Sequence, residues 1–206
     1  MTNSKKPNFI IIVADDLGFT DTAAFGGEIA TPNIKRLADS GLRFTDFHTA
    51  SACSPTRSML LSGTDNHIAG LGQMQEFAQR IPERFKGKPG YEGYLNFKVA
   101  ALPEILKDAG YYNFISGKWH LGLSPEHWPG KRGFEKSFTL LPGAGNHFKY
   151  FPKDDKGEYL NFQLPLFEEN GRKVDADSEI PENYYSSDYF TDKFLEQLGS
   201  EDRQGR

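Results

Sequence analysis

Hydrophobic and polar positions alternate along the first two-thirds of the chain in blocks typical of strands and helices. Residues 8–14 (NFIIIVA) form a continuous apolar run rich in β-branched side chains. Such a run is typical of a strand that is buried on both faces of a parallel sheet. Residues 31–41 (TPNIKRLADSG) predict a helix, with Thr31 as its N-cap, Pro32 at the first helical position and Gly41 just beyond its end.

The same signals recur further along the chain. Residues 42–50 (LRFTDFHTA) predict a short strand, and residues 54–63 (SPTRSMLLSG) predict a second helix capped by Ser54. A helix over residues 99–110 and a strand over residues 111–117 follow. Strands separated by helices predict βαβ units, and therefore an α/β fold with a mainly parallel sheet flanked by helices.

From about residue 145 the pattern changes. The segment is polar, contains many Tyr and Phe side chains and turn formers, and shows no clear core strand. Residues 186–199 alone have apolar side chains at helical spacing, with Ser187 as a possible cap. We therefore expect residues 1–150 to form the α/β core portion and residues 151–206 to form a loop-rich extension with one helix.

Composition excludes some classes of partner. The 206 residues carry a net charge of -4 and the pI is about 5.8, so a basic surface for nucleic acid is not indicated. The apolar run after Lys6 is six residues long, from Phe9 to Ala14, and it ends in two aspartates. That run is too short for a signal sequence or a membrane span. We expect no membrane partner and a cytoplasmic location.

Asp15 and Asp16 are candidate metal ligands. They directly follow the first predicted strand, and ligands of open α/β sheets bind beyond the carboxyl ends of strands. Two adjacent carboxylates are costly unless a cation neutralises them, and hard oxygen ligands favour calcium or magnesium. A solvated turn, helped by Gly18, explains the same residues, and both interpretations stay open.

Cys53 is the single cysteine, which excludes an internal disulfide. It lies just before a predicted helix, where unpaired backbone N–H groups attract anions and lower a cysteine pKa to between about 3.5 and 7.5. Arg57, one turn later, could hold a tetrahedral anion. Because Met59 occupies the sixth position after the cysteine, a cysteine phosphatase loop does not fit. The alternative is a small buried hydrophobic side chain.

Lys118 and His120 end a predicted strand two residues apart. Alternate strand residues point to the same side, so both can face one site. Lysine offers a positive charge to an anion, and histidine can exchange a proton near neutral pH. A solvated strand end around a packed tryptophan is the alternative.

Taken together, these features resemble the sulfatase family. The segment over residues 47–74 most resembles the alkyl- and arylsulfatase branch. Two residues depart from the family pattern: Ser62, where threonine is usual, and Asn113, where serine or threonine is usual. The motifs that carry the resemblance are the opening strand and aspartate pair (7–21), the first signature (53–57 with 61–63) and the second signature (110–111 with 117–120).

The resemblance implies an alkaline-phosphatase-like sulfatase N-terminal region and a formylglycine-dependent reaction. Maturation machinery would convert Cys53 to formylglycine (3-oxoalanine), and the hydrated aldehyde would attack the sulfur of an alkyl or aryl sulfate ester. The products would be an alcohol and inorganic sulfate. The partners implied are therefore a small-molecule sulfate ester and the formylglycine-generating machinery.

The resemblance also implies a role for each candidate residue. Asp15, Asp16 and the modified Cys53 would bind one Ca²⁺ ion. The catalytic residues besides Cys53 would be Arg57, which orients the modified side chain, Lys118, which binds a sulfate oxygen, and His120, which stabilises the hydroxyl that collapses the intermediate.

Family chains are longer, and their later aspartate–asparagine pair of calcium ligands has no counterpart here. We therefore expect a truncated chain that lacks a C-terminal segment and hydrolyses no sulfate ester alone. Two alternatives stay open. One is a phosphonate monoester or phosphodiester hydrolase of the same superfamily, and the other is a non-catalytic remnant with an unmodified Cys53 thiol.

Overall fold

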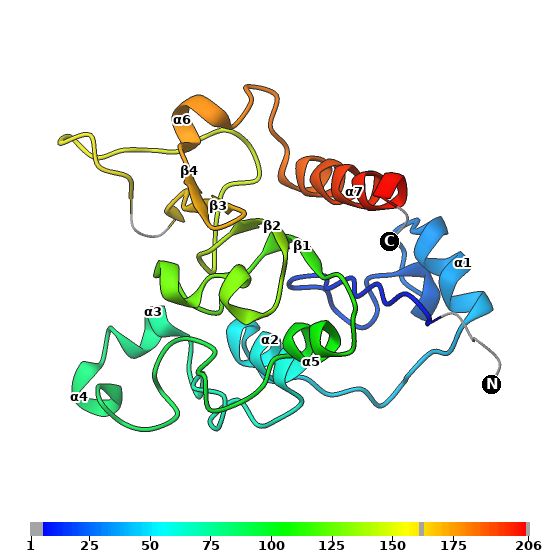
Figure 1. Cartoon of the computed structure of the whole chain (residues 1–206), viewed down its shortest axis with the longest axis horizontal. Coiled ribbons are helices and arrows are strands. Elements are labelled where there is room, and N and C mark those ends of the chain that lie inside the picture. Colours follow the sequence, from blue (N-terminus) through cyan, green and yellow to red (C-terminus); the bar gives the residue numbers. More distant parts are fainter. Residues whose placement is uncertain (1–5, 161–162, 205–206) are drawn as a thin grey trace. The chain divides into compact units, whose positions relative to one another are not determined.

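The computed structural model describes residues 6–160 and 163–204, with side chains described as far as residue 200. The chain divides into two compact units, residues 1–49 and residues 50–206, which are coloured from dark blue to light blue and from cyan to red in Figure 1. Each unit is described by itself.

The first unit contains a short 3₁₀ helix and one α-helix. The 3₁₀ helix η1 spans Ala23–Phe25 and the helix α1 spans Pro32–Ser40, which confirms the predicted helix. Thr31 occupies the N-cap position, but its Oγ1 accepts a hydrogen bond of 3.0 Å from the Ala23 backbone N–H instead of capping α1. Thr31 therefore fastens η1 to the start of α1.

The strands predicted over residues 8–14 and 42–50 do not form in the first unit. Both segments lack ladder pairing in the described part of the chain, and their apolar side chains are exposed, to 83% at Ile12 and 85% at Leu42. A strand exists only where a neighbour completes its backbone hydrogen bonds. An apolar pattern predicts a preference for burial, but it cannot supply that neighbour.

The second unit is built around a four-stranded sheet of order β1-β2-β3-β4. The strands span Phe114–Lys118, Lys136–Leu140, Phe167–Glu169 and Arg172–Val174. β1 and β2 are parallel, whereas β2–β3 and β3–β4 are antiparallel. The α/β class is confirmed, and β1 confirms the strand predicted over 111–117. The sheet of the described residues is mixed rather than mainly parallel.

β3 and β4 lie beyond residue 145, where the sequence pattern showed no core strand. A two-residue turn joins them, with Asn170 at φ 51° and Gly171 at φ 82°. An Asn-Gly pair with both φ values positive is the preferred link of a tight β-hairpin. The sheet thus takes strands from both sides of residue 150, and the division into two parts at that residue stays a prediction.

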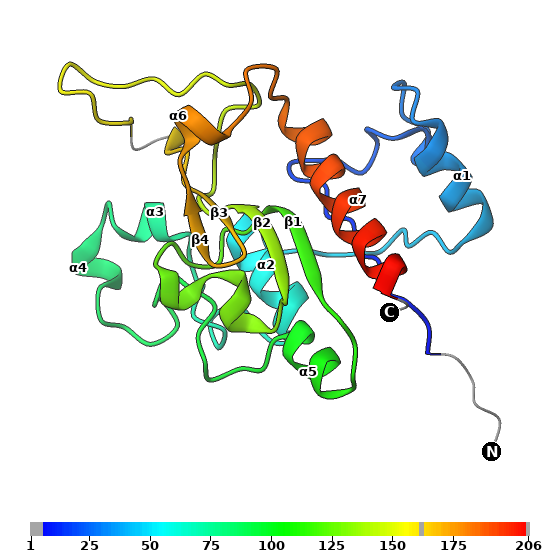
Figure 2. The same cartoon turned by 45° about the horizontal axis from the view of Figure 1, so that its top comes forward.

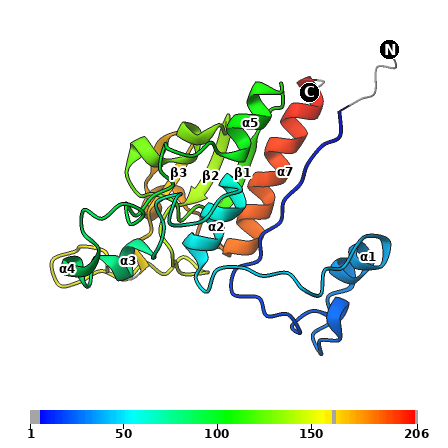
Figure 3. The ribbon, with the colours of Figure 1, turned by 90° about the horizontal axis from the view of Figure 1, so that it is seen from below.

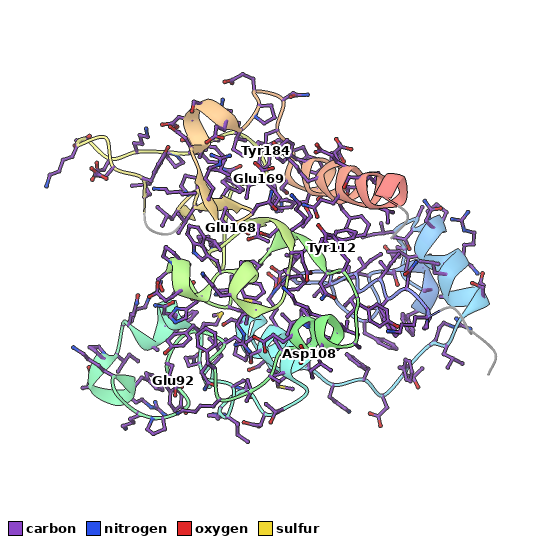
Figure 4. The ribbon with its side chains drawn as sticks, in the orientation of Figure 1. Glu92, Asp108, Tyr112, Glu168, Glu169 and Tyr184 are labelled. Carbon is purple, nitrogen blue, oxygen red and sulfur yellow. The ribbon has the colours of Figure 1, made fainter. Side chains whose placement is uncertain are left out.

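Glu168 ties this hairpin to β2. Its side chain is fully buried, and its carboxylate accepts hydrogen bonds from Ser137 Oγ (3.1 Å), Thr139 Oγ1 (2.8 Å) and the Gly171 backbone N–H (3.0 Å). Figure 4 shows Glu168 and Glu169 on β3, with Tyr184 beyond them. Buried carboxylates are tolerated when hydrogen bonds satisfy them, so these donors fix the position of β3.

Three helices of the second unit correspond to helices predicted from the sequence: α2 (Cys53–Ser62), α5 (Leu102–Asp108) and α7 (Ser186–Gln204). Their bounds differ from the prediction. α2 begins at Cys53, with Ala52 rather than Ser54 at the N-cap, and α5 is shorter than predicted at both ends. α7 contains Ser187, the predicted cap, and extends beyond residue 199 to Gln204. No helix in the described ranges is long and apolar enough to cross a membrane. The helices are α2 (Cys53–Ser62), α3 (Gln75–Ala78), α4 (Pro82–Phe85), α5 (Leu102–Asp108), η2 (Pro125–His127), η3 (Pro129–Arg132), α6 (Ala176–Glu179) and α7 (Ser186–Gln204).

Helix α7 packs along β1, as Figures 2 and 3 show. The rings of Phe114 and Phe194 lie 5.1 Å apart, and Ser116 Oγ donates a 2.7 Å hydrogen bond to the Phe190 carbonyl.

Helices α2 and α5 contact each other (Figure 1). The core has two clusters: one contains Leu71, Leu95, Trp119, Leu121 and Leu141, and the other contains Phe138, Phe167, Val174, Ile180 and Tyr184.

Arg132 holds the loop that precedes α5. Its side chain is fully buried. Its guanidinium donates to the backbone carbonyls of Leu95 (2.7 Å), Asn96 (2.9 Å) and Val99 (2.8 Å), and to the Glu104 carboxylate (2.8 Å). One planar cation therefore satisfies several oxygens that would otherwise lose their solvation without compensation.

We predict that Arg132→Met destabilises the fold by about 3 kcal/mol or more, because it leaves these oxygens without a donor. The free energy of unfolding in urea measures this loss. Arg172→Met is the control, because Arg172 is half-exposed and paired at the surface with Glu169 and Glu179, where ion pairs contribute little. Equal stability of the two variants would contradict the role of Arg132.

Candidate active site

Cys53 is the first residue of α2, and it is half-buried. The next residues, Ser54 and Pro55, are buried and anchor this end of the helix. At the other end Gly63 adopts φ 64°, and its N–H donates a 2.8 Å hydrogen bond to the Met59 carbonyl. The N-terminus of a helix presents unpaired N–H groups and a partial positive charge. The sequence predicted Cys53 just before the helix, whereas the structure has it as the first helical residue. Cys53 therefore still lies within the positive electrostatic field of the helix N-terminus.

Lys118 and His120 reach the site from the end of β1. Beyond Lys118 the chain stays bonded to the end of β2 and the residue that follows it, because Trp119 N–H donates to the Leu140 carbonyl (2.9 Å) and His120 N–H to the Leu141 carbonyl (3.1 Å). The Trp119 side chain is buried, and its Nε1–H donates to a carbonyl at 3.0 Å. His120 is 6% exposed, so this strand end is not solvated.

The backbone of His120 has φ 56°. A non-glycine residue in this left-handed region is uncommon, and such conformations persist where the surroundings determine them, frequently at functional sites. Asp16, another candidate residue, has φ 55°. His120 and Asp16, two candidate residues of the sequence analysis, therefore share an unusual backbone conformation.

Cys53, His120 and Glu76 form a hydrogen-bonded row. Cys53 Sγ lies 3.3 Å from His120 Nδ1, and His120 Nε2 lies 3.1 Å and 3.2 Å from the two Glu76 carboxylate oxygens. Met74 Sδ lies 3.5 Å from Cys53 Sγ on another side. The row places an imidazole between a sulfur atom and a carboxylate, an arrangement that can move a proton at the Cys53 position.

Electrostatics in this row favour charge separation. The hydrogen bond from His120, opposed by burial and helped by the charge of Lys118, lowers the pKa of the Cys53 thiol. Burial disfavours the charged form of His120, but its bonds to Cys53 and Glu76 outweigh this effect and raise its pKa. For Glu76, burial is likewise outweighed by the bond to His120, and the pKa falls to about 2.

Arg57 and Lys118 complete the cluster. Arg57 donates from a terminal guanidinium nitrogen to the Lys118 carbonyl at 2.9 Å, which joins α2 to the end of β1. The Lys118 ammonium is close enough to Cys53 to lower its pKa by charge and hydrogen bonding. The structure therefore brings together Cys53, Arg57, Lys118 and His120, the four residues predicted to be catalytic.

Glu76 and Met74 were not predicted from the sequence. Glu76 lies on the four-residue helix α3, and Met74 occupies the position before it. No spacing to another polar residue distinguishes Glu76 among the 28 acidic residues of the chain. Its proximity to His120, which is 44 positions away in sequence, arises from tertiary structure, and no local signal could have identified it.

Asp15 and Asp16, the predicted metal ligands, are exposed residues of the first unit. They offer the hard oxygens that calcium prefers. Within the described ranges, however, no group of three or more His, Cys, Asp or Glu side chains is placed to hold a metal ion. Calcium takes 6 to 8 oxygens, so the described residues do not by themselves complete a calcium site.

The lowered pKa of Cys53 predicts the reactivity of its unmodified thiol towards iodoacetamide. At pH 7 the wild-type thiol carries more thiolate than free cysteine, so it reacts faster. His120→Ala removes the main cause of the lowered pKa. The thiolate fraction at pH 7 then falls by up to about tenfold for each unit by which the pKa rises, and the rate falls by about threefold, because a more basic thiolate is intrinsically more nucleophilic. Well above the ordinary thiol pKa of about 8.5 both thiols are fully ionised, so the disadvantage of the variant disappears.

Alkylation followed by mass spectrometry across pH checks this prediction. His67→Ala is the matched control, because His67 is an exposed histidine that pairs with Asp65. A His120→Ala thiol that reacts like wild type at pH 7 would contradict the hydrogen bond between the ring and the sulfur.

Comparison with known proteins gives a consistent result. The sequence model of the Sulfatase family matches residues 7–206. An uncharacterized sulfatase of Schizosaccharomyces pombe is 61% identical over 200 residues, which cover 97% of this chain and 36% of the relative. The arylsulfatase of Klebsiella aerogenes is 37% identical over 195 residues, which cover 90% of this chain and 38% of the relative.

Solved structures agree on the fold. The crystal structure of Ps i-CgsB has a TM-score of 0.73 and 30% identity, and the match covers 95% of this chain and 42% of that protein. The PsFucS1 sulfatase from Pseudoalteromonas sp. has a TM-score of 0.69 at 20% identity, over 98% of this chain and 42% of that protein, which supports the fold alone. The chain spans about a third of the length of the curated relatives it matches. It belongs to the sulfatase family.

Proposed function

We propose that the protein is a sulfuric ester hydrolase of the arylsulfatase type, with Cys53 as the residue that becomes its nucleophile. The observation that carries this proposal is the position of Cys53 Sγ in the first turn of α2, 3.3 Å from His120 Nδ1. The arylsulfatase of Klebsiella aerogenes supports the reaction class by its name. Alkyl and aryl sulfate esters are the proposed substrates.

Conversion of Cys53 to formylglycine supplies a hydrated aldehyde whose hydroxyl group can attack the sulfur of the ester. In the conversion, Cβ is oxidised by two electrons, the C–S bond breaks and a C=O bond forms. The formylglycine-generating machinery must therefore provide an oxidant. Cys53 is half-buried rather than sealed in the core, so the proposal requires no unfolding of α2 before substrate binds.

The other residues of the site have roles that follow from their charge and position. Lys118 and the N–H groups at the start of α2 would stabilise the anionic sulfate oxygens. Arg57 is fixed by the Lys118 carbonyl and can orient the modified side chain. His120 Nδ1 faces the Cys53 position and can take or return a proton there.

For the metal, we propose that Asp15 and Asp16 contribute carboxylate oxygens to one calcium ion, with a hydroxyl of the modified Cys53 as a further ligand. When bound, the ion would supply positive charge that polarises the nucleophile. Further ligands are required beyond those of the described residues. The reaction steps above rest on the protein side chains alone.

We predict that the protein purified from its native host hydrolyses an aryl sulfate, and that Cys53→Ala lowers this activity by several orders of magnitude. Removing a covalent nucleophile removes the reaction path and leaves only binding and electrostatic effects. Release of the phenol under steady-state conditions measures the activity. The sequence analysis also predicts that the 206-residue chain hydrolyses no sulfate ester by itself. The same assay on the recombinant 206-residue chain tests that expectation.

The same preparation distinguishes the alternative reaction classes. Faster turnover of a phosphate diester than of the aryl sulfate would favour the phosphodiester hydrolase alternative over the proposal. Complete inactivity of the native protein towards both ester types would favour the non-catalytic alternative.

The calcium proposal has a readout that is independent of activity. Replacing Asp15 and Asp16 together by Asn removes two negative ligands, so calcium affinity in titration calorimetry falls at least about tenfold, because ligand charge sets the affinity of such sites. Asp39→Asn is the control, because Asp39 is an exposed residue of α1 that pairs with Lys35. Unchanged calcium affinity in the double variant would remove both aspartates from the ligand set.

A further inference from the structure

The His120 ring is confined by contacts that the reaction scheme does not yet use. One ring nitrogen, Nδ1, faces Cys53 Sγ at 3.3 Å, and the other, Nε2, lies 3.1 Å from Glu76 Oε1. The ring is also nearly inaccessible, with His120 6% exposed. Its two nitrogens are therefore committed to different partners.

Gly143 confines the ring from a further direction. A Cβ atom built on Gly143 would lie 2.4 Å from His120 Cε1 and 2.5 Å from Nε2. These distances are shorter than real Cβ contacts, so only glycine fits beside the ring. The Gly143 backbone also helps to lower the pKa of the Glu76 carboxyl. Gly143 thus lies directly against the His120 ring.

Glu76 contributes to the orientation of the His120 ring rather than to the stability of the fold. Its side chain is 42% exposed, and a partly exposed ion pair contributes little to folding. A carboxylate, however, can only accept hydrogen bonds, so it requires a proton on Nε2 and leaves Nδ1 directed at Cys53. Carboxylates that hold a histidine in one tautomer have large effects on activity in unrelated enzymes.

We propose that Glu76 is a positioning residue that fixes the His120 ring with Nδ1 towards the reacting group at position 53. The inference rests on the proposed function, because it assigns His120 a task in that reaction. In the neutral ring the Nδ1 lone pair takes a proton from a hydroxyl at the Cys53 position. The resulting imidazolium charge then lies beside the Glu76 carboxylate, which compensates it.

Steady-state kinetics of an aryl sulfate test the proposal, with each variant expressed in the native host. We expect Glu76→Ala to lower kcat about 100-fold, as for a catalytic group that is displaced by about 1 Å, and to leave KM within about twofold. Glu76→Gln keeps an acceptor oxygen without the charge and restores part of kcat. Glu83→Ala, which alters an exposed glutamate of helix α4, is the matched control and keeps the wild-type kcat.

Gly143→Ala is the second variant, because it displaces the ring by contact and changes no charge. We expect it to lower kcat with a small effect on KM. Peptide mass spectrometry of position 53 in every variant confirms that the compared preparations contain equal amounts of converted Cys53. Wild-type kcat in Glu76→Ala with converted Cys53 would overturn the proposal.

Nitrogen NMR of histidine-labelled protein gives a readout that does not need activity. At an alkaline pH at which the ring is neutral, we expect wild-type His120 to hold its proton on Nε2. Glu76→Ala is expected to show a mixture of both tautomers. An unchanged tautomer in Glu76→Ala would overturn the inference even if the wild-type protein hydrolysed no sulfate ester. That inactivity would itself count against the proposed function.

Discussion

The site depends on the contact between Cys53 Sγ and His120 Nδ1, which joins residues 67 positions apart in sequence. This contact requires the N-terminus of α2 and the end of β1 to meet at a fixed distance. The Arg57 bond to the Lys118 carbonyl links the same two elements, and the backbone bonds from Trp119 and His120 to the end of β2 and the residue after it fix the strand end. The clustering of the predicted catalytic residues is therefore a consequence of how one helix and one strand are held together.

Buried polar groups supply much of that support. Arg132 binds the loop before α5 through backbone carbonyls, and Glu168 binds the β3–β4 hairpin to β2. Each group is costly to bury and is tolerated because its hydrogen bonds are made. The apolar clusters around Trp119 and Phe138 provide the hydrophobic driving force. The buried arginine and glutamate specify which loops and strands lie beside one another.

Sequence reasoning succeeded where the signal was local. Proline near the start and glycine after the end predicted α1 and α2, and the glycine at the end predicted α5. The predicted catalytic residues Cys53, Arg57, Lys118 and His120 lie together. The pair Asn170–Gly171 was also a local signal, and it would have identified the missed hairpin. The strand predicted over residues 8–14 failed because pairing depends on a neighbour. Glu76 could not be found because its relation to His120 exists only in the folded chain.

The central claim is that Cys53 is the reacting centre of a sulfatase, and peptide mass spectrometry of protein from the native host tests it most directly. Formylglycine replaces the sulfur and two hydrogens of cysteine with one oxygen, so the account predicts a Cys53 peptide about 18 Da lighter than the unmodified one. An unmodified thiol, in a host that converts its other sulfatases, would contradict the account.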